Sequence, residues 1–304
     1  MSTSTPTSPP SSTAQPRLNR VQCIGSTGLY DMAYWEWGDP ANDRVVVCVH
    51  GLSRQGRDFD VLAQSLMGEF RVVCPDVVGR GQSDWLADPA GYTNPRYAVD
   101  MVTLLARVDA KELYWVGTSM GGLIGLGLTS LPKSPVRKLV LNDVGPNLSM
   151  DALTRIGSYL GKAPPFKSED EAADYLRTIS AGFGPHTREQ WMSLSRPMLK
   201  PDPADGAQGF VLHYDPKIAA PFSTFSGEAV AAGQAMLWHA YDAIRCPTLL
   251  LRGGDSDLLT RDTAQQMTTR GPKAKLIEFA GVGHAPTLIA PDQVAAVREF
   301  LLGP

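Results

Sequence analysis

The sequence predicts an α/β fold in which a mostly parallel sheet carries helices on both faces and is interrupted by an inserted helical segment. Three observations support this. Strand-like runs such as residues 45–50 and 248–251 are continuously apolar, which is typical of strands buried on both faces. Helical patterns alternate with these runs over most of the 304 residues. After residue 146 the alternation stops for roughly a hundred residues, and helix starts replace strands.

The same patterns predict the individual strands and helices of the sheet domain. The expected strands are residues 21–24, 30–37, 45–50, 70–74, 113–117, 138–141, 248–252 and 275–279. The expected helices are residues 58–66, 94–108, 121–128, 261–269 and 291–302. Asn94 followed by Pro95 is typical of a helix start, because proline tolerates the first helical turn. We therefore expect residues 21–146 and 243–304 to form the sheet domain.

Two further segments complete the expected organisation. Residues 1–20 are expected to be a disordered tail, because Ser2 to Pro16 are nearly all Ser, Thr, Pro, Ala and Gln. Residues 147–242 are expected to be a helical cap. Its expected helix starts are the capping-box pairs Ser168 with Glu171 and Thr187 with Gln190, together with Ser226 before the stretch from Gly227 to Trp238. Aromatic residues are dense in the cap, and we expect most to form its core and a few to line a pocket facing Ser119: Tyr159, Phe166, Tyr175, Phe183, Trp191, Phe210, Tyr214, Phe222, Phe225 and Trp238. We also expect that trimming Trp191 or Trp238 alters acyl-length preference.

Composition excludes several classes of partner. The net charge is −3 and there is no basic run, so we expect neither nucleic acid nor a membrane surface as a partner. No apolar run is long enough to span a membrane, and the N-terminus lacks the apolar core of a secretory signal, so the cytoplasm is the expected location. The four cysteines are expected to be reduced core residues rather than a disulfide or metal framework.

The chain is organised around residues 116–122, Val-Gly-Thr-Ser-Met-Gly-Gly. An apolar strand runs into this stretch and a small-residue helix follows it, with Ser119 at the apex. The pattern Gly117-x-Ser119-x-Gly121 is that of a nucleophile elbow, in which a strained serine stands above the sheet edge. Side chains at the two glycine positions would collide with the neighbouring strand and helix.

A serine nucleophile needs a base, and His284 is the best candidate among five histidines. It follows the last expected strand and so lies at the same edge of the sheet as Ser119. An oxyanion also needs N–H donors, and we assign these to Met120, after the nucleophile, and to Leu52, in the loop after a central strand. His50 ends that strand and is given a supporting role.

Together these motifs resemble the α/β-hydrolase superfamily. His50-Gly51, Asp76-x-x-Gly79-Arg80-Gly81-x-Ser83-Asp84, Gly117-x-Ser119-x-Gly121 and Gly283-His284 stand in the order and at the spacing of that family. The chain looks like the branch of small bacterial serine esterases and lactonases with a helical cap. The resemblance implies an eight-stranded, mostly parallel sheet, a Ser–His–acid triad, and neither a metal nor an organic cofactor.

The acid of the triad has two candidates. The family's usual acid follows the seventh strand as Gly-x-x-Asp, but this spacing from Gly253 leads to Ser256, and only counting from Gly254 leads to Asp257. Other relatives place the acid after the sixth strand, where Asp143 stands about two dozen residues beyond Ser119. Either carboxylate can orient the imidazole. We favour Asp143 and keep Asp257 as the alternative.

We therefore expect a cofactor-free serine hydrolase that cleaves an ester of a small to medium carboxylic acid through an acyl-enzyme. One alternative is a C–C or amide-bond hydrolase with the same triad. Another is a ligand-binding protein on this scaffold that does not turn over. Arg54, Gln55 and Trp85 lie on loops expected near the mouth of the site. The sequence identifies neither the acyl and alcohol groups nor the oligomeric state.

Overall fold

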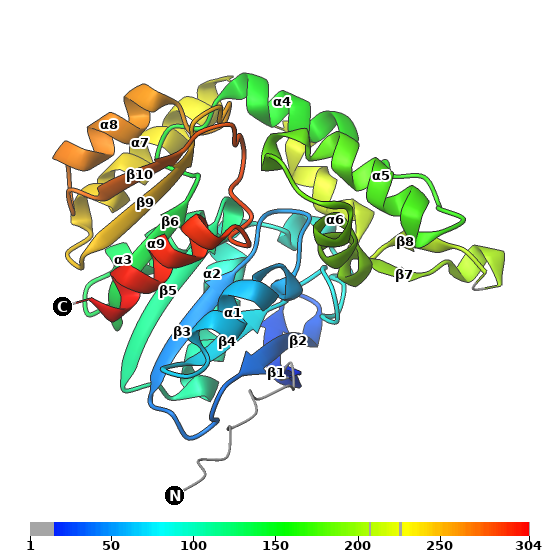
Figure 1. Cartoon of the computed structure of the whole chain (residues 1–304), viewed down its shortest axis with the longest axis horizontal. Helices are drawn as coiled ribbons and strands as arrows, with labels where there is room; N and C mark the ends of the chain where they lie inside the picture. The colour runs from blue at the N-terminus through cyan, green and yellow to red at the C-terminus, as the bar shows by residue number, and fades with distance from the viewer. Residues whose placement is uncertain (1–14, 207, 225–226, 304) are drawn as a thin grey trace, which may run out of the picture.

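An eight-stranded sheet forms the centre of the computed structural model, which describes residues 15–206, 208–224 and 227–303 (Figure 1). Its strands are β1 (Arg17–Gly25), β2 (Gly28–Trp37), β3 (Arg44–Val49), β4 (Arg71–Pro75), β5 (Glu112–Thr118), β6 (Val136–Asn142), β9 (Thr248–Gly253) and β10 (Lys275–Phe279). They are ordered β1-β2-β4-β3-β5-β6-β9-β10 across the sheet. Only β2 runs against its neighbours, and the other pairs are parallel. The predicted fold class is confirmed.

Helices cover both faces of this sheet. They are α1 (Asp60–Leu66), α2 (Asn94–Val108), α3 (Met120–Ser130), α8 (Arg261–Thr269) and α9 (Pro291–Leu302). One apolar cluster joins α1 and α9 to the sheet, and a second joins α2, α3 and α8 to its other face. Figure 1 shows α1 and α9 in front of the strands and α2 and α3 behind them. Burial on both faces explains why the central strands are continuously apolar.

The sheet begins earlier than its sequence pattern suggests. β1 begins at Arg17, so residues 17–20 belong to the sheet and the expected tail boundary at residue 20 is wrong. Arg17 pairs in register with Glu36 of β2, and its guanidinium donates to the Glu36 carboxylate. This edge strand is largely exposed, so it lacks the apolar run that marks the others. Residues 1–14 lie outside the described part of the chain.

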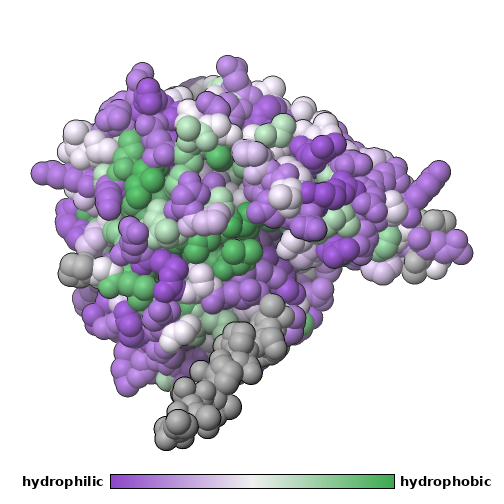
Figure 2. Space-filling view, in the orientation of Figure 1, coloured by the Kyte–Doolittle hydropathy of each residue, from purple (hydrophilic) through white to green (hydrophobic). Residues whose placement is uncertain are grey.

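Between β6 and β9 the chain leaves the sheet. This segment holds α4 (Met150–Tyr159), α5 (Glu169–Ile179), α6 (Arg188–Ser195) and α7 (Gly227–Ala243), together with a two-stranded sheet of β7 (Leu199–Pro201) and β8 (Phe210–Leu212). In Figure 1, α5, α6, β7 and β8 project from the sheet domain, and in Figure 2 this projection is mainly hydrophilic. α7 instead packs against α3. β7 and β8 were not predicted, since three-residue strands leave little pattern.

The helix starts in this segment follow local rules. Thr187 and Gln190 form a full capping box at the start of α6. Ser168 caps α5 by accepting from the Glu171 N–H, but the Glu171 carboxylate accepts from the backbone of Lys167 instead of completing the box. Ser226 lies outside the described residues. In the described part of the chain, every helix is too short or too polar to cross a membrane.

Candidate active site

Ser119 lies at the turn between β5 and α3. Its backbone has φ 51° and ψ −115°, a conformation that residues other than glycine rarely adopt. The two glycines of the motif make this turn possible. A Cβ atom at Gly117 would lie 2.3 Å from the carbonyl oxygen of Gly121, and one at Gly121 would lie 2.0 Å from that of Val49. Any larger residue at either position would therefore push the strand and helix apart.

His284 links Ser119 to Asp143. Its Nε2 lies 3.0 Å from Ser119 Oγ, and its Nδ1 lies 2.7 Å from Asp143 Oδ2. Because an ionised carboxylate can only accept, the imidazole carries its proton on Nδ1 and offers Nε2 as the acceptor for the serine hydroxyl. Asp143 is fully buried, whereas the His284 side chain is 12% exposed. This arrangement can move a proton from the serine to the imidazole.

Two further donors hold the Asp143 carboxylate. The backbone N–H of Gly253 donates to Oδ1 at 2.8 Å, and the Ser256 hydroxyl donates to Oδ2 at 2.6 Å. Both come from the end of β9 and the loop after it. Ser256 therefore contacts the same carboxylate oxygen as His284. The sequence placed Ser256 at the family's usual acid position without assigning it a role.

Asp257, the alternative acid, contacts a different partner. Its two carboxylate oxygens accept from Nε and Nη2 of Arg155, at 2.7 and 2.9 Å. Asp257 is about half exposed and joins the loop after β9 to α4. The structure thus brings Asp143 to His284 and places Asp257 in an ion pair with the segment above the sheet.

The backbone N–H groups of Leu52 and Met120 are the expected oxyanion donors. Among the described residues, neither group donates a hydrogen bond to another protein group. Arg80, which is fully buried, contacts both residues: its Nε donates to the Leu52 carbonyl at 2.8 Å, and its Nη2 lies 3.7 Å from Met120 Sδ. The sequence showed Arg80 as part of a motif but did not indicate that it fixes these two residues relative to each other.

His50 holds the loop that carries Leu52. The Val77 N–H donates to Nε2 at 2.9 Å, so Nδ1 carries the proton and donates to the Gly51 carbonyl at 2.7 Å. Burial lowers the pKa of the His50 imidazole to about 3, which keeps it neutral at physiological pH. This network ties the loop after β3 to the loop after β4.

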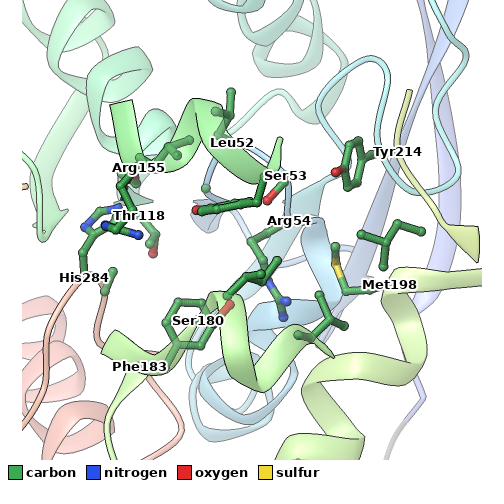
Figure 3. Close-up of a pocket in the computed structure, with 18 residues that line it drawn as sticks. Leu52, Ser53, Arg54, Thr118, Arg155, Ser180, Phe183, Met198, Tyr214 and His284 are labelled. Carbon is green, nitrogen blue, oxygen red and sulfur yellow. Dashed lines mark hydrogen bonds between the residues drawn. The ribbon is translucent and has the colours of Figure 1, made fainter. Parts of the chain in front are cut away.

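Two cavities meet at Ser119. The first, the histidine-side cavity, is lined by His284, Thr118, Arg54 and Arg155 among others (Figure 3). The second, the neutral cavity, has a volume of about 300 Å³ and is lined by Met120, Leu123, Leu153 and Phe222 among others. Of the described residues, the two cavities share Leu52, Ser119 and Ile156. A substrate bound at the serine can therefore extend in two directions.

A few aromatic residues of the segment between β6 and β9 line these cavities, as expected. Tyr159, Phe183 and Tyr214 line the histidine-side cavity. Trp191 instead stacks behind Phe183, with ring centroids 6.0 Å apart, and Trp238 donates to Asn147. Among the described residues, neither tryptophan lines a cavity at Ser119, and their effect on acyl-length preference stays a prediction. The density of aromatic residues in a segment does not distinguish those that line a pocket from those that pack behind them.

The three residues expected near the mouth of the site lie in different places. Arg54 lines the histidine-side cavity, whereas Gln55 is buried. Trp85 is exposed beneath the Lys200 ammonium, which lies 4.1 Å from its ring centroid. Trp85 and Lys200 line a separate groove that shares Leu212 and Tyr214 with the histidine-side cavity.

The segment above the sheet also contacts the loop that carries the histidine. The Gly283 N–H donates to the Gly182 carbonyl at 2.6 Å, and His186 Nε2 lies 2.8 Å from Thr287 Oγ1. A Cβ atom at Gly182 would lie 3.1 Å from the backbone nitrogen of His284. The loop between α5 and α6 thus packs directly on the backbone of His284.

Comparison with known proteins gives the same picture of the fold. A model of the alpha/beta hydrolase family matches residues 46–297. A 3-hydroxybutyrate-oligomer hydrolase from Cupriavidus necator is 55% identical over 290 residues, covering 95% of this chain and 99% of the relative. Esterase YbfF from Escherichia coli is 26% identical, covering 86% of this chain and 94% of the relative.

Among solved structures, an alpha/beta hydrolase from Novosphingobium aromaticivorans superposes with a TM-score of 0.82 at 33% identity. The match covers 95% of this chain and 99% of the other.

Proposed function

Because the chain belongs to the alpha/beta hydrolase family, we propose that it is a serine hydrolase whose triad is Ser119, His284 and Asp143. The observation that carries the proposal is the continuous chain of contacts from Ser119 Oγ through the imidazole to the Asp143 carboxylate. These residue types in this order activate a serine for attack on an acyl carbon. Hydrolase activity fits both the family and the esterase relatives.

The proposed reaction has two stages. His284 takes the Ser119 proton as the hydroxyl attacks the ester carbonyl, and Asp143 stabilises the resulting imidazolium. The Leu52 and Met120 N–H groups bind the oxyanion, which their lack of other partners supports. His284 then protonates the leaving alcohol. Water, activated by the same imidazole, releases the acid and restores the serine.

The proposed substrate is a small ester built from hydroxy acid units. The name of the Cupriavidus relative and its 55% identity over nearly the whole chain support 3-hydroxybutyrate oligomers as the class to test. Two cavities at the serine suit an ester with a substantial group on each side of the bond. We further propose that residues 147–242 act as a cap over residues 21–146 and 243–304.

The direct test is hydrolysis of the 3-hydroxybutyrate dimer and trimer, followed by titration of the acid released. We expect turnover by the wild-type protein and a loss on the order of 10⁶ in kcat for Ser119→Ala. Ser130→Ala, at the far end of α3, is the matched control and should behave like wild type. Wild-type turnover by a folded Ser119→Ala protein would refute the proposal.

A further inference from the structure

The two cavities at Ser119 differ in charge. Arg54 and Arg155 both line the histidine-side cavity, whereas none of the described residues that line the neutral cavity is charged. Figure 3 places Arg155, Thr118 and His284 on one side of the histidine-side cavity. A negatively charged part of a substrate would therefore be favoured on one side of the serine only.

The position of His284 decides which part of an ester enters which cavity. This step rests on the proposed function. The imidazole must return its proton to the oxygen of the leaving alcohol, so the leaving fragment lies on the side of the serine that His284 lines. The acyl fragment then extends into the neutral cavity, next to Met120 and Leu123.

Hydroxy acid oligomers have a direction that matches this asymmetry. Such a chain has a free hydroxyl at one end and a free carboxylate at the other. When any of its ester bonds is cleaved, the acyl fragment keeps the hydroxyl end and stays on the serine. The leaving fragment gains a hydroxyl and keeps the carboxylate. The leaving fragment is thus an anion, and it enters the cavity that holds the cations.

The two arginines differ in how firmly they are bound. Arg54 is 10% exposed, donates through Nε and Nη2 to Asp58, and also donates to the Leu194 carbonyl at the end of α6. Its Nε and Nη2 donors are thus already occupied by protein acceptors. Arg155 is 41% exposed and pairs with Asp257, which is 47% exposed. Water competes for both members of such a pair, so it exchanges partners readily.

We infer that Arg155 binds the carboxylate of the leaving fragment and so selects substrates that end in a free acid. Its guanidinium can form two parallel hydrogen bonds with a carboxylate, as it does with Asp257. The substrate then takes the place of Asp257 or binds beside it. Arg155 acts as a specificity residue, orienting the oligomer with its carboxylate end on the histidine side.

The test compares the 3-hydroxybutyrate dimer with the same dimer bearing a terminal carboxamide, which differs mainly in charge. We expect kcat/KM to favour the acid by about 10- to 100-fold in the wild-type protein. Arg155→Gln should bring the ratio near one, and Arg155→Lys should keep part of it. The matched control is Arg177→Gln, which removes an exposed arginine of α5 that lines neither cavity, and it should keep the wild-type ratio.

A second measurement needs only the wild-type protein. 3-Hydroxybutyrate should inhibit hydrolysis of a neutral activated ester more strongly than 3-hydroxybutyramide does. Equal inhibition by the two compounds would overturn the inference. In the first test, an acid-to-carboxamide ratio of kcat/KM that Arg155→Gln leaves unchanged would also overturn it. Equal hydrolysis of both dimers would also refute it and leave the proposed function standing. No hydrolysis of either dimer would refute the proposed substrate class itself.

Discussion

Ser256 Oγ donates to Asp143 Oδ2 at 2.6 Å, and that same oxygen lies 2.7 Å from His284 Nδ1. A carboxylate that accepts from both a serine and a histidine is fixed in position and cannot rotate away from the imidazole. The loop after β9, where the usual acid of the family stands, here supplies a hydrogen-bond donor to Asp143, the proposed acid, which directly follows β6. Ser256, at the usual position of the acid, thus donates a hydrogen bond to the proposed acid.

The first prediction concerns Ser256. Ser256→Ala should lower kcat by about 10- to 150-fold, because a hydrogen bond to a charged group contributes about 1.5–3 kcal/mol. KM should change much less, since Ser256 does not line the cavities at Ser119. Steady-state kinetics on an activated ester measure both constants. A folded variant with wild-type kcat would show that Asp143 needs no support from this loop.

The second prediction compares the two candidate acids. Asp143→Asn should lower kcat by about 10⁴, as in another triad, because the amide favours the wrong imidazole tautomer. Asp257→Asn should cost less than about tenfold on a neutral activated ester, because its carboxylate is half exposed and pairs with Arg155. Measuring kcat of the two variants under the same conditions shows which carboxylate is the acid. The opposite ranking would move the acid to the loop after β9.

The third prediction concerns acyl length. Leu153 of α4 lines the neutral cavity, so Leu153→Trp should fill part of its volume. Each buried methylene contributes about 0.8 kcal/mol, roughly fourfold in rate. We therefore expect the preference for hexanoyl over acetyl p-nitrophenyl esters to fall about tenfold or more. If the preference is unchanged, the acyl group lies in the other cavity.

The fourth prediction concerns acid sensitivity through His50. Its pKa is about 3 in the folded state and about 6.5 when unfolded, so the unfolded chain binds the extra proton between these values. His50 therefore costs stability as pH falls, by about 2–3 kcal/mol between pH 7 and pH 4.5. His50→Asn should lose this dependence. Urea unfolding of both proteins at the two pH values gives the difference, and parallel pH profiles would contradict the assignment.

Much of the sheet domain could be predicted because its strands are buried on both faces and its turns need particular residues. The stretch around Ser119 is the clearest case, since only glycine fits at Gly117 and Gly121. The edge strand β1 was placed too short because half of its residues face solvent and carry no apolar signal. Local patterns suffice where burial is complete and fail where it is partial.

The site was harder to predict where it depends on contacts between distant segments. Motifs indicated Ser119 and His284. Two strand ends each offered a carboxylate, and the sequence does not show which carboxylate lies closer to His284. The roles of Arg80 and Arg155 depend on folding that brings loops and helices together around the serine. Such contacts have no fixed spacing along the chain, so no motif could have revealed them.

The hydrogen bond from the Gly283 N–H to the Gly182 carbonyl has a mechanical consequence. If the segment between β6 and β9 moved away as a rigid body, it would break this bond and shift the backbone beside His284, the proposed general base. We therefore expect movement of this segment to disturb the position of the His284 imidazole. Anyone who exchanges this segment for that of another hydrolase must supply a carbonyl at the same place, or the new enzyme will bind its substrate beside a loosened histidine.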